Sequence, residues 1–467
     1  MNCNEIIIPR DAGGKKINER GMADKILQDH RLVYCQGVMY RYVPAEEVFK
    51  VQSRNQIMVL IGNAFNEYAR DTNIENLDAL LTQNALDGIW KWLCALSEDN
   101  AAFAGKRFLY HCRNGVLCLE GNKIILKKGS PDFRSRWRSE ISYNPQSVPR
   151  RFLQDFLGTA LSEDQISQLQ LYLGQCLYGK NKSQTFLLLT GTAGSGKSTL
   201  ATLVENLIGR PNFGSLRLGH TNGRFELGRL VGRNLITAKD VPPDFLSQNS
   251  GANLKALTGH DFMEVEFKNS NERPEIRGDF NVIISSNSIL RLKIASDIEA
   301  WRRRLVWIDY RKATVAKKIE GFERILLQEE GSGILNWAIQ GLIKLIDAGW
   351  QMPRSPEQNR QIDFLLKSSD PVRVFVKNFI GISATGDLAT DEILIAYNLV
   401  SEHYRWDSFT RRMVALQLKA LLPELHGATA TNTVRRNGKR LRGYIGVRLR
   451  LPSDFEEKIK NKQSVHA

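Results

Sequence analysis

The sequence contains no apolar stretch long enough to cross a membrane, and its few cysteines carry no metal-binding spacing. The six cysteines are scattered without a C-x-x-C pair. Cys112 and Cys118 lie near His111, but no second ligand pair follows, so we expect no zinc site. The seven histidines do not cluster, and residues 1–16 lack the apolar core of a signal peptide. These absences predict a cytoplasmic protein with reduced cysteines and no membrane partner.

The composition instead shows a large excess of positive charge. The chain has 467 residues, a net charge of +15 and 42% hydrophobic residues. This length predicts several domains with real cores. An excess of this size favours a polyanionic partner, nucleic acid before membrane, although a generally basic soluble protein is the alternative.

The most informative motif is a P-loop of the pattern G-x-x-x-x-G-K-[ST]. An apolar strand is predicted just before it, and apolar residues recur at helical spacing after it, which is the context that the motif requires. Lys197 is expected to neutralise the β- and γ-phosphates of ATP, and the Ser198 hydroxyl to bind Mg²⁺. The predicted nucleotide-binding residues are Gly191, Thr192, Ala193, Gly194, Ser195, Gly196, Lys197, Ser198 and Thr199.

Two further strands end in polar residues suited to ATP hydrolysis. Asp240 follows the apolar residues 234–238 and is the candidate for holding Mg²⁺ and orienting water, with Asp244 as the fallback. Asn287 follows residues 281–286 and is the candidate sensor of the γ-phosphate, although an Asn after a strand is commonly a turn residue.

Basic residues then supply the candidates for transition-state and DNA contacts. Arg304, with Arg303 next, precedes an apolar strand and could reach a neighbouring subunit's nucleotide, the alternative being a solvated face. Residues 262–277 are predicted to form a hairpin carrying Lys268 and Arg273, whose basic tip could grip a phosphate backbone or simply face solvent. A second basic hairpin, with a type I′ turn at Asn437-Gly438, contains Arg435, Arg436, Lys439 and Arg440.

These patterns divide the chain into four predicted parts. Residues 1–150 form a mixed α+β region for oligomerisation or partner docking, and residues 151–315 form an α/β ATPase core with a parallel sheet. Residues 316–370 form a helical lid or linker. Residues 371–455, in which helices precede the basic hairpin, resemble a winged-helix domain.

The order of motifs resembles the superfamily 3 helicases, specifically the helicase half of the phage, plasmid and poxvirus primase–helicases. The likeness covers most of residues 20–450 and is strongest over 185–345. It is carried by the P-loop, Arg224-Phe-Glu-Leu227 with Leu230-Val-Gly-Arg233, the strand before Asp240, Lys255-Ala-Leu-Thr-Gly-His-Asp261, the strand before Asn287, Trp301-Arg-Arg-Arg304, and Gly333-Ile-Leu-Asn-Trp337 with Gly341-Leu342.

The resemblance implies an AAA+ ATPase that assembles into a ring, usually a hexamer, and moves along single-stranded DNA. It gives Lys197 and Ser198 the P-loop roles, Asp240 the Mg²⁺ and water role, Asn287 the sensor role and Arg304 the role of a finger in trans. Lys268 falls at the pore-hairpin position. Three departures stand out: Lys239 precedes Asp240, no proline follows Asn287 closely, and the primase half with its D-x-D pair is absent.

The leading hypothesis is therefore an ATP-dependent replicative helicase of a phage, plasmid or other mobile element, acting in a bacterial cytoplasm on single-stranded and forked DNA. A separate primase or polymerase would supply priming. The rival is an initiator or helicase loader that binds origin duplex and does not unwind it. A third reading is an ATPase that only binds RNA or pumps nucleic acid into a capsid.

Overall fold

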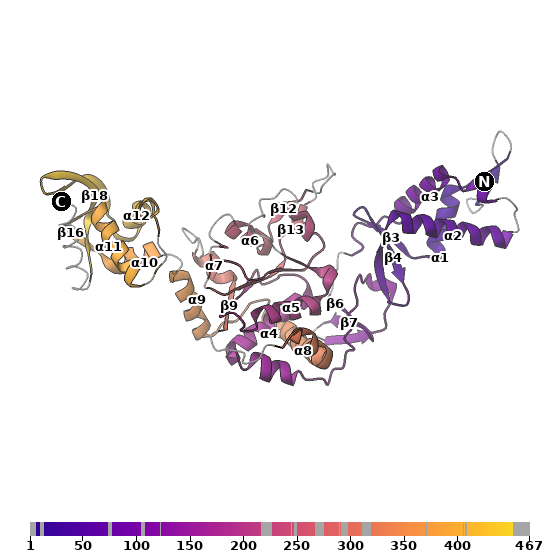
Figure 1. Ribbon diagram of the computed structural model, residues 1–467, viewed down its shortest axis with the longest axis horizontal. Coiled ribbons are helices and arrows are strands. Elements are labelled where there is room, and N and C mark those ends of the chain that lie inside the picture. Colours follow the sequence, from indigo (N-terminus) through magenta and orange to yellow (C-terminus); the bar gives the residue numbers. More distant parts are fainter. Residues whose placement is uncertain are drawn as a thin grey trace.

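The structure, a computed structural model, describes most of the chain in segments that together form three units. The described residues are 6–9, 14–72, 77–103, 108–121, 123–215, 227–243, 245–246, 250–266, 275–288, 290, 298–310, 319–368, 371–404, 406 and 409–451. In Figure 1 the helices α1–α3 lie at one end, the α10–α12 group lies at the other, and the P-loop unit lies between them.

The N-terminal unit packs three helices against a small antiparallel sheet. Asn18 begins the first helix by accepting a hydrogen bond from the Gly21 amide at 3.1 Å, as an N-cap residue does. The mixture of helices and strands predicted for this region is confirmed. The elements are β1 (Ile7–Pro9), β2 (Lys15–Ile17), α1 (Glu19–Asp29), β3 (Leu32–Cys35), β4 (Val38–Val43), β5 (Val48–Gln52), α2 (Arg54–Thr72), η1 (Leu77–Leu80) and α3 (Gln83–Leu96).

A second antiparallel sheet belongs to the central unit, although it precedes residue 150. It consists of β6 (Leu109–Cys112), β7 (Gly115–Glu120) and β8 (Lys123–Lys127). Phe108, Tyr110 and Leu117 are buried in the same core as the P-loop helix, whereas Ala102 and Phe103 still pack against the sheet of the N-terminal unit. The hydrophobic cores thus change between residues 103 and 108, earlier than the boundary predicted at 150.

The central unit is built on a five-stranded, wholly parallel sheet. Its order is β10 (Phe213–Ser215), β11 (Leu235–Ala238), β14 (Asn281–Ser286), β9 (Phe186–Gly191) and β15 (Leu305–Tyr310). The four predicted apolar strands are confirmed, and β10 is an addition at the edge. Because β14 lies between β9 and β11, the chain crosses over rather than adding strands in sequence.

Helices cover both faces of this sheet, which explains its continuous apolar strands. Leu187 and Leu189 of β9 point into one core, and Phe186 and Leu188 point into the other. In Figure 1 the helices α4, α5 and α8 lie below the sheet, and α6 and α7 lie above it. The bounds are α4 (Glu163–Tyr178), α5 (Lys197–Ile208), α6 (Ser250–Thr258), α7 (Ile298–Arg304), α8 (Phe322–Asp347) and α9 (Pro356–Ser368).

Glycines allow α4 and α8 to cross almost in backbone contact. A Cβ on Gly174 would lie 2.2 Å from the Leu342 amide nitrogen, and one on Gly341 would lie 2.1 Å from the Gln170 carbonyl oxygen. The Gly341-Leu342 pair, in the second half of α8, marks the tightest contact between the two helices. A short π-helical turn, η3 (Phe152–Leu157), precedes α4.

The proline-containing segment 145–149 is fixed on α8. The Asn336 side-chain amide donates to the carbonyl oxygens of Asn144 and Ser147 at 2.8 and 2.9 Å. A Cβ on Gly333 would lie 2.6 Å from the Pro149 nitrogen. Residues 145–149 are thus held against the central unit by both packing and hydrogen bonds.

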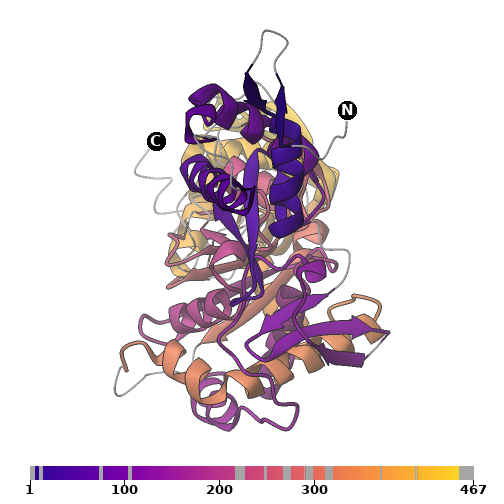
Figure 2. The same ribbon diagram turned by 90° about the vertical axis from the view of Figure 1, so that its right-hand side faces the viewer.

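The C-terminal unit has its own core and a three-stranded antiparallel sheet of order β16-β18-β17. The turn between β17 and β18 has positive φ at both Asn437 (49°) and Gly438 (75°), which confirms the predicted type I′ hairpin. Figure 2, which faces the N-terminal end of the molecule, shows this unit behind the N-terminal helices. Its elements are α10 (Pro371–Phe379), β16 (Ile380–Ala389), α11 (Thr390–His403), α12 (Arg411–His426), β17 (Thr429–Arg436) and β18 (Lys439–Leu449).

Candidate functional site

The P-loop has the backbone of an anion-binding turn. β9 runs into the loop, and α5 begins at Lys197. Gly191, Gly194 and Gly196 have φ values of 138°, 79° and 97°, which glycine adopts without steric cost. Residues 192–194 are exposed. The loop therefore offers backbone N–H groups and the positive end of α5 to a phosphate.

Lys197 is folded back over this loop. Its ammonium group donates to the carbonyl oxygens of Gly191 and Thr192, both at 2.8 Å, and to Ser195 Oγ at 3.2 Å. Burial lowers the pKa of Lys197, and the carboxylates of Asp240 and Asp309 oppose that shift. The ammonium thus lies over the loop within electrostatic reach of two carboxylates, while Ser198 and Thr199 follow on the first turn of α5.

Asp240 lies at the carboxyl end of β11, as its predicted role requires. Its side chain is exposed, its φ is 51°, and its amide donates to Ser285 Oγ of β14 at 3.2 Å. That hydrogen bond fixes the turn that carries the carboxylate. Asn287 is exposed directly after β14. The P-loop, Asp240 and Asn287 therefore stand on one edge of the sheet; Asp244 lies outside the described residues.

Lys239, which departs from the expected acidic or small residue, has a defined place. Its ammonium donates to Glu205 Oε2 at 2.7 Å and to Thr202 Oγ1 at 2.8 Å, both on α5. The other Glu205 oxygen accepts from Thr237 Oγ1 at 2.5 Å. Lys239 thus joins β11 to α5 and neutralises Glu205. Its ammonium group is directed to α5 and not to the carboxylate of Asp240.

Asp309, near the end of β15, is an acidic residue of this edge that the sequence reasoning missed. It lies opposite Thr190 in the ladder, and the Thr190 hydroxyl donates to Asp309 Oδ1 at 2.9 Å. The Trp307 indole N–H donates to the same hydroxyl at 2.8 Å. The sequence does contain a signal for this residue, because Asp309 is the single charged residue of the otherwise apolar strand 305–310. A charge in a buried strand is costly unless it is paired or hydrogen-bonded.

A Mg²⁺ ion fits the donor set at this edge. Mg²⁺ takes a few protein oxygens together with waters and substrate phosphates. The Ser198 hydroxyl and the Asp240 carboxylate supply two such oxygens beside the loop. Among the residues that the structure describes, no group of three or more His, Cys, Asp or Glu side chains could hold a metal by itself.

The predicted finger arginines lie at the opposite edge of the sheet. Arg304 precedes β15, whose first residue pairs with Phe186 at the start of β9. Six strand residues span roughly 17 Å, so these side chains are remote from their own P-loop. Arg304 is only 7% exposed, with Nη1 donating to the Ala300 carbonyl, whereas Arg303 is exposed. Arg303 is thus the more accessible of the two predicted finger arginines.

The predicted hairpin of residues 262–277 is confirmed in its ladder. β12 (Phe262–Glu264) pairs antiparallel with β13 (Glu275–Arg277). Lys268 and Arg273, the proposed tip residues, lie outside the described residues, so their role stays a prediction.

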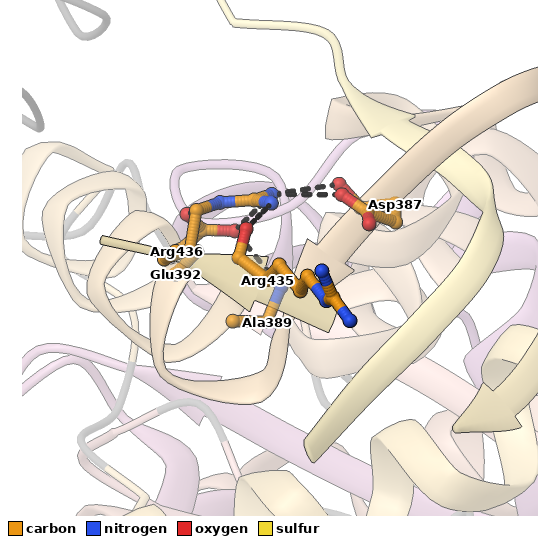
Figure 3. Close-up of polar contacts among 5 residues, drawn as sticks. All are labelled: Asp387, Ala389, Glu392, Arg435 and Arg436. Carbon is orange, nitrogen blue, oxygen red and sulfur yellow. Dashed lines mark hydrogen bonds and ion pairs between the residues drawn. The ribbon is translucent and has the colours of Figure 1, made fainter. Parts of the chain in front are cut away.

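Of the four residues of the C-terminal hairpin predicted to contact DNA, three are accessible and one is already ion-paired. Arg435, Lys439 and Arg440 are exposed. Arg436 instead donates through Nε to Glu392 at 2.8 Å and through Nη2 to Asp387 at 3.0 Å (Figure 3). The hydrogen bonds to Glu392 raise the pKa of Arg436. Arg436 therefore helps to hold the fold of this unit, and this disfavours the predicted DNA contact.

The comparisons with known proteins leave this site without an assigned activity. Residues 189–304 match a family described as a family of unknown function (DUF5906). No curated protein matches. The fold is similar to the apo A form of the NrS-1 C-terminal region, with 11% identity, a TM-score of 0.48, and coverage of 91% of this chain and 98% of that one.

A second structure of the NrS-1 C-terminal region, residues 305–718, covers 72% of this chain with 13% identity and a TM-score of 0.41. Likeness at this level concerns the fold alone. Within the described part of the chain, no helix is long and apolar enough to span a membrane.

Proposed function

We propose that this protein is a ring-forming AAA+ ATPase that unwinds DNA during replication of a mobile element. The observation that carries the proposal is the juxtaposition at one sheet edge of the P-loop, Asp240 and Asn287. The crossover order, with β14 between β9 and β11, brings the two polar strand ends to the side of the loop where a γ-phosphate would lie. ATP and Mg²⁺ are the cofactors that this donor set suits.

Each side chain has a defined task in ATP hydrolysis. Lys197 would exchange its loop carbonyls for β- and γ-phosphate oxygens, and Ser198 and Asp240 would hold Mg²⁺, which neutralises developing charge when bound. Asp240 would also orient the attacking water, and Asn287 would bind the γ-phosphate. The chain's own contribution is positioning and charge, which dominate phosphoryl transfer.

An arginine from a neighbouring subunit would complete the site. The arginines of α7 are too far from their own P-loop to act there, so any role at a nucleotide must be in trans. Arg303 is favoured because its side chain is exposed and can reach toward a neighbouring subunit. Arg304 is buried, and the same movement would break its hydrogen bond to the Ala300 carbonyl. The transition-state charge that such a finger stabilises accounts for rate factors of roughly 10³–10⁵.

The C-terminal unit supports a DNA-binding role. Its order, helix–strand–helix–helix–strand–strand, is the one expected of a winged helix, in which β17 and β18 would form the wing. Arg435 and Arg440 are paired directly across the hairpin. Like charges so placed destabilise a ladder, which suits a surface that meets an anion. The same observation fits an origin-binding initiator or loader, the second candidate function.

Strand displacement on forked DNA tests the proposal. We expect wild type to separate the strands only with ATP and Mg²⁺, and Lys197→Ala and Arg303→Ala each to abolish displacement. Arg360→Ala, an exposed arginine on α9, is the matched control and should keep full activity. Mixing the two inactive variants should restore part of the ATP hydrolysis, because some interfaces then combine an intact P-loop with an intact finger.

The alternatives give different results. DNA-stimulated hydrolysis without displacement would favour the initiator or loader. A shared site completed by Arg303 is refuted by the following combination of results. Arg303→Ala still displaces the strand, whereas Arg304→Ala does not, and mixing Arg304→Ala with Lys197→Ala restores no ATP hydrolysis.

A further inference from the structure

Three arginines meet where the N-terminal unit adjoins the outer edge of the central sheet. Arg136 belongs to the segment after β8, Arg210 lies just after α5, and Arg233 lies just before β11. Arg136 Nη2 donates to the Gly232 carbonyl at 3.2 Å, and Arg233 Nη1 donates to the Arg210 carbonyl at 3.1 Å. We call this group the edge arginines.

The edge arginines are held together without a neutralising acid. Within the described ranges, none of the three forms an ion pair, whereas Arg151, Arg302 and Arg436 each do. Backbone carbonyls and aromatic rings hold the edge arginines instead. The guanidinium of Arg136 lies 5.2 Å from the Phe103 ring centroid, and that of Arg210 lies 5.1 Å from the Phe213 ring centroid.

This arrangement concentrates positive charge at a fixed place. Burial lowers the pKa of Arg233, and the charges of Arg136 and Arg210 lower it further. Arg210 is exposed, and the other two are half-buried. Guanidinium groups that are oriented by backbone contacts but not neutralised keep N–H donors for an anion, and their planar fork matches phosphate oxygens.

We propose that the edge arginines bind the phosphate backbone of a DNA strand, as a contact separate from the pore hairpin and from the C-terminal unit. The site is distinct from the nucleotide site, because Arg210 lies past the far end of α5 and a helix of twelve residues is about 18 Å long. The net charge of +15 makes a polyanion the fitting occupant. The inference rests on the proposed function in that the chain must bind DNA.

The test measures DNA affinity of the full chain by fluorescence anisotropy over a range of salt concentrations. One probe is a labelled single strand and the other a labelled duplex, which separates the two forms of backbone. The test variant is Arg136→Gln/Arg210→Gln. Arg233 is spared because it holds two backbone carbonyls, those of Arg210 and Pro211, whereas Arg136 holds one. The control is Arg20→Gln/Arg360→Gln, which removes the same charge from two exposed, ion-paired arginines.

We expect the test variant to bind a single strand tenfold or more weakly at low salt. Its plot of log affinity against log salt should lose about 1.4 of slope, since each phosphate contact to a single strand contributes about 0.7. The Arg136→Lys/Arg210→Lys variant should recover part of the DNA affinity and part of the salt slope. Nucleotide binding without DNA should be unchanged, which shows that the variant is folded.

Three results would overturn the proposal. If the test variant has the slope and affinity of the control, the edge arginines do not bind DNA although the proposed function stands. If it keeps DNA affinity but no longer assembles in sedimentation, the cluster binds an acidic surface of a second copy. If wild type binds neither probe, the proposed function fails first and this site with it.

Discussion

Substituting Arg436 and substituting its neighbour Arg435 should have opposite consequences. Both are arginines of β17 in the basic hairpin, and the sequence treats them alike. In the structure Arg435 is exposed, whereas Arg436 bridges Glu392 and Asp387 (Figure 3). We expect Arg436→Gln to destabilise the C-terminal unit without a direct loss of DNA contact, and Arg435→Gln to weaken DNA binding without loss of stability.

The size of the stability loss follows from the contacts. Arg436 donates to both oxygens of Glu392, at 2.8 and 3.0 Å. Hydrogen bonds between charged groups contribute roughly 1.5–3 kcal/mol each. The Glu392 side chain is only 16% exposed, but Arg436 and Asp387 are each 36% exposed, so solvent screening reduces the total. Glu392 also keeps its bond from the Ala389 amide. We therefore expect a loss of about 2 kcal/mol.

Hydrogen exchange measured by mass spectrometry on the full chain is the suitable assay, because it reports on each unit separately. A loss of about 2 kcal/mol speeds exchange of the most protected amides of β16 and β18 about thirtyfold. Exchange in the central sheet should not change. Arg435→Gln should alter exchange in neither unit.

DNA affinity at a temperature where both variants are folded completes the comparison. Arg435→Gln should weaken binding and reduce the salt slope, and Arg436→Gln should match wild type. The reasoning is refuted if Arg436→Gln leaves exchange unchanged, or if the two variants weaken DNA binding equally.

Three further predictions concern the central unit. Gly341→Ala should destabilise it by about 3 kcal/mol, because the new methyl meets the Gln170 carbonyl of α4; an unchanged denaturation midpoint would show that the helices separate easily. The Asp309 carboxylate raises the pKa of Lys197, so Asp309→Asn should shift the loss of ATP affinity at alkaline pH to a lower pH. Nucleotide titrations between about pH 7 and 10 test this. If the pH dependence of ATP affinity does not shift, Asp309 has no effect on Lys197. Burial lowers the pKa of His111, so its contribution to stability is present above the ordinary His pKa of about 6.5 and is lost as pH falls. His111→Gln should therefore flatten the decrease in thermal stability between about pH 7 and 5, and an equal decrease in both proteins would contradict this.

The sequence was sufficient for the elements whose signals are local. The strand–glycine–helix pattern around Lys197, the apolar strands before Asp240 and Asn287, and the Asn437-Gly438 turn all predicted backbone that the structure has. Each depends on residues within a few positions of one another. The sheet class followed from the same local patterns.

What the sequence could not supply depends on partners distant in the chain. Arg435 and Arg436 differ only because Glu392, more than forty residues earlier, lies beside one of them. Asp309 gains its place from Thr190, and the short edge strand β10 exists because Leu235 lies beside Phe213. The boundary between the cores before Phe108 likewise depends on packing onto α5. No change in amino-acid composition marks this boundary in the sequence.

Helix α9 and the residue before it contact the end of the sheet that carries the arginines of α7. This connection could couple nucleotide binding near α7 to DNA binding by the C-terminal unit. Asp363 of α9 is paired with Arg302, and Arg354, just before α9, donates to the carbonyls of Arg303 and Leu305 at 3.1 and 2.8 Å. The apolar side chains of α9 are buried in the sheet core, and α10 begins the C-terminal unit three residues after α9 ends. In the proposed ring, a displacement of α7 on binding of a neighbour's nucleotide would be transmitted through α9 to the C-terminal unit. Since coupling between two sites is reciprocal, DNA held by that unit would alter the neighbour's nucleotide affinity by the same factor.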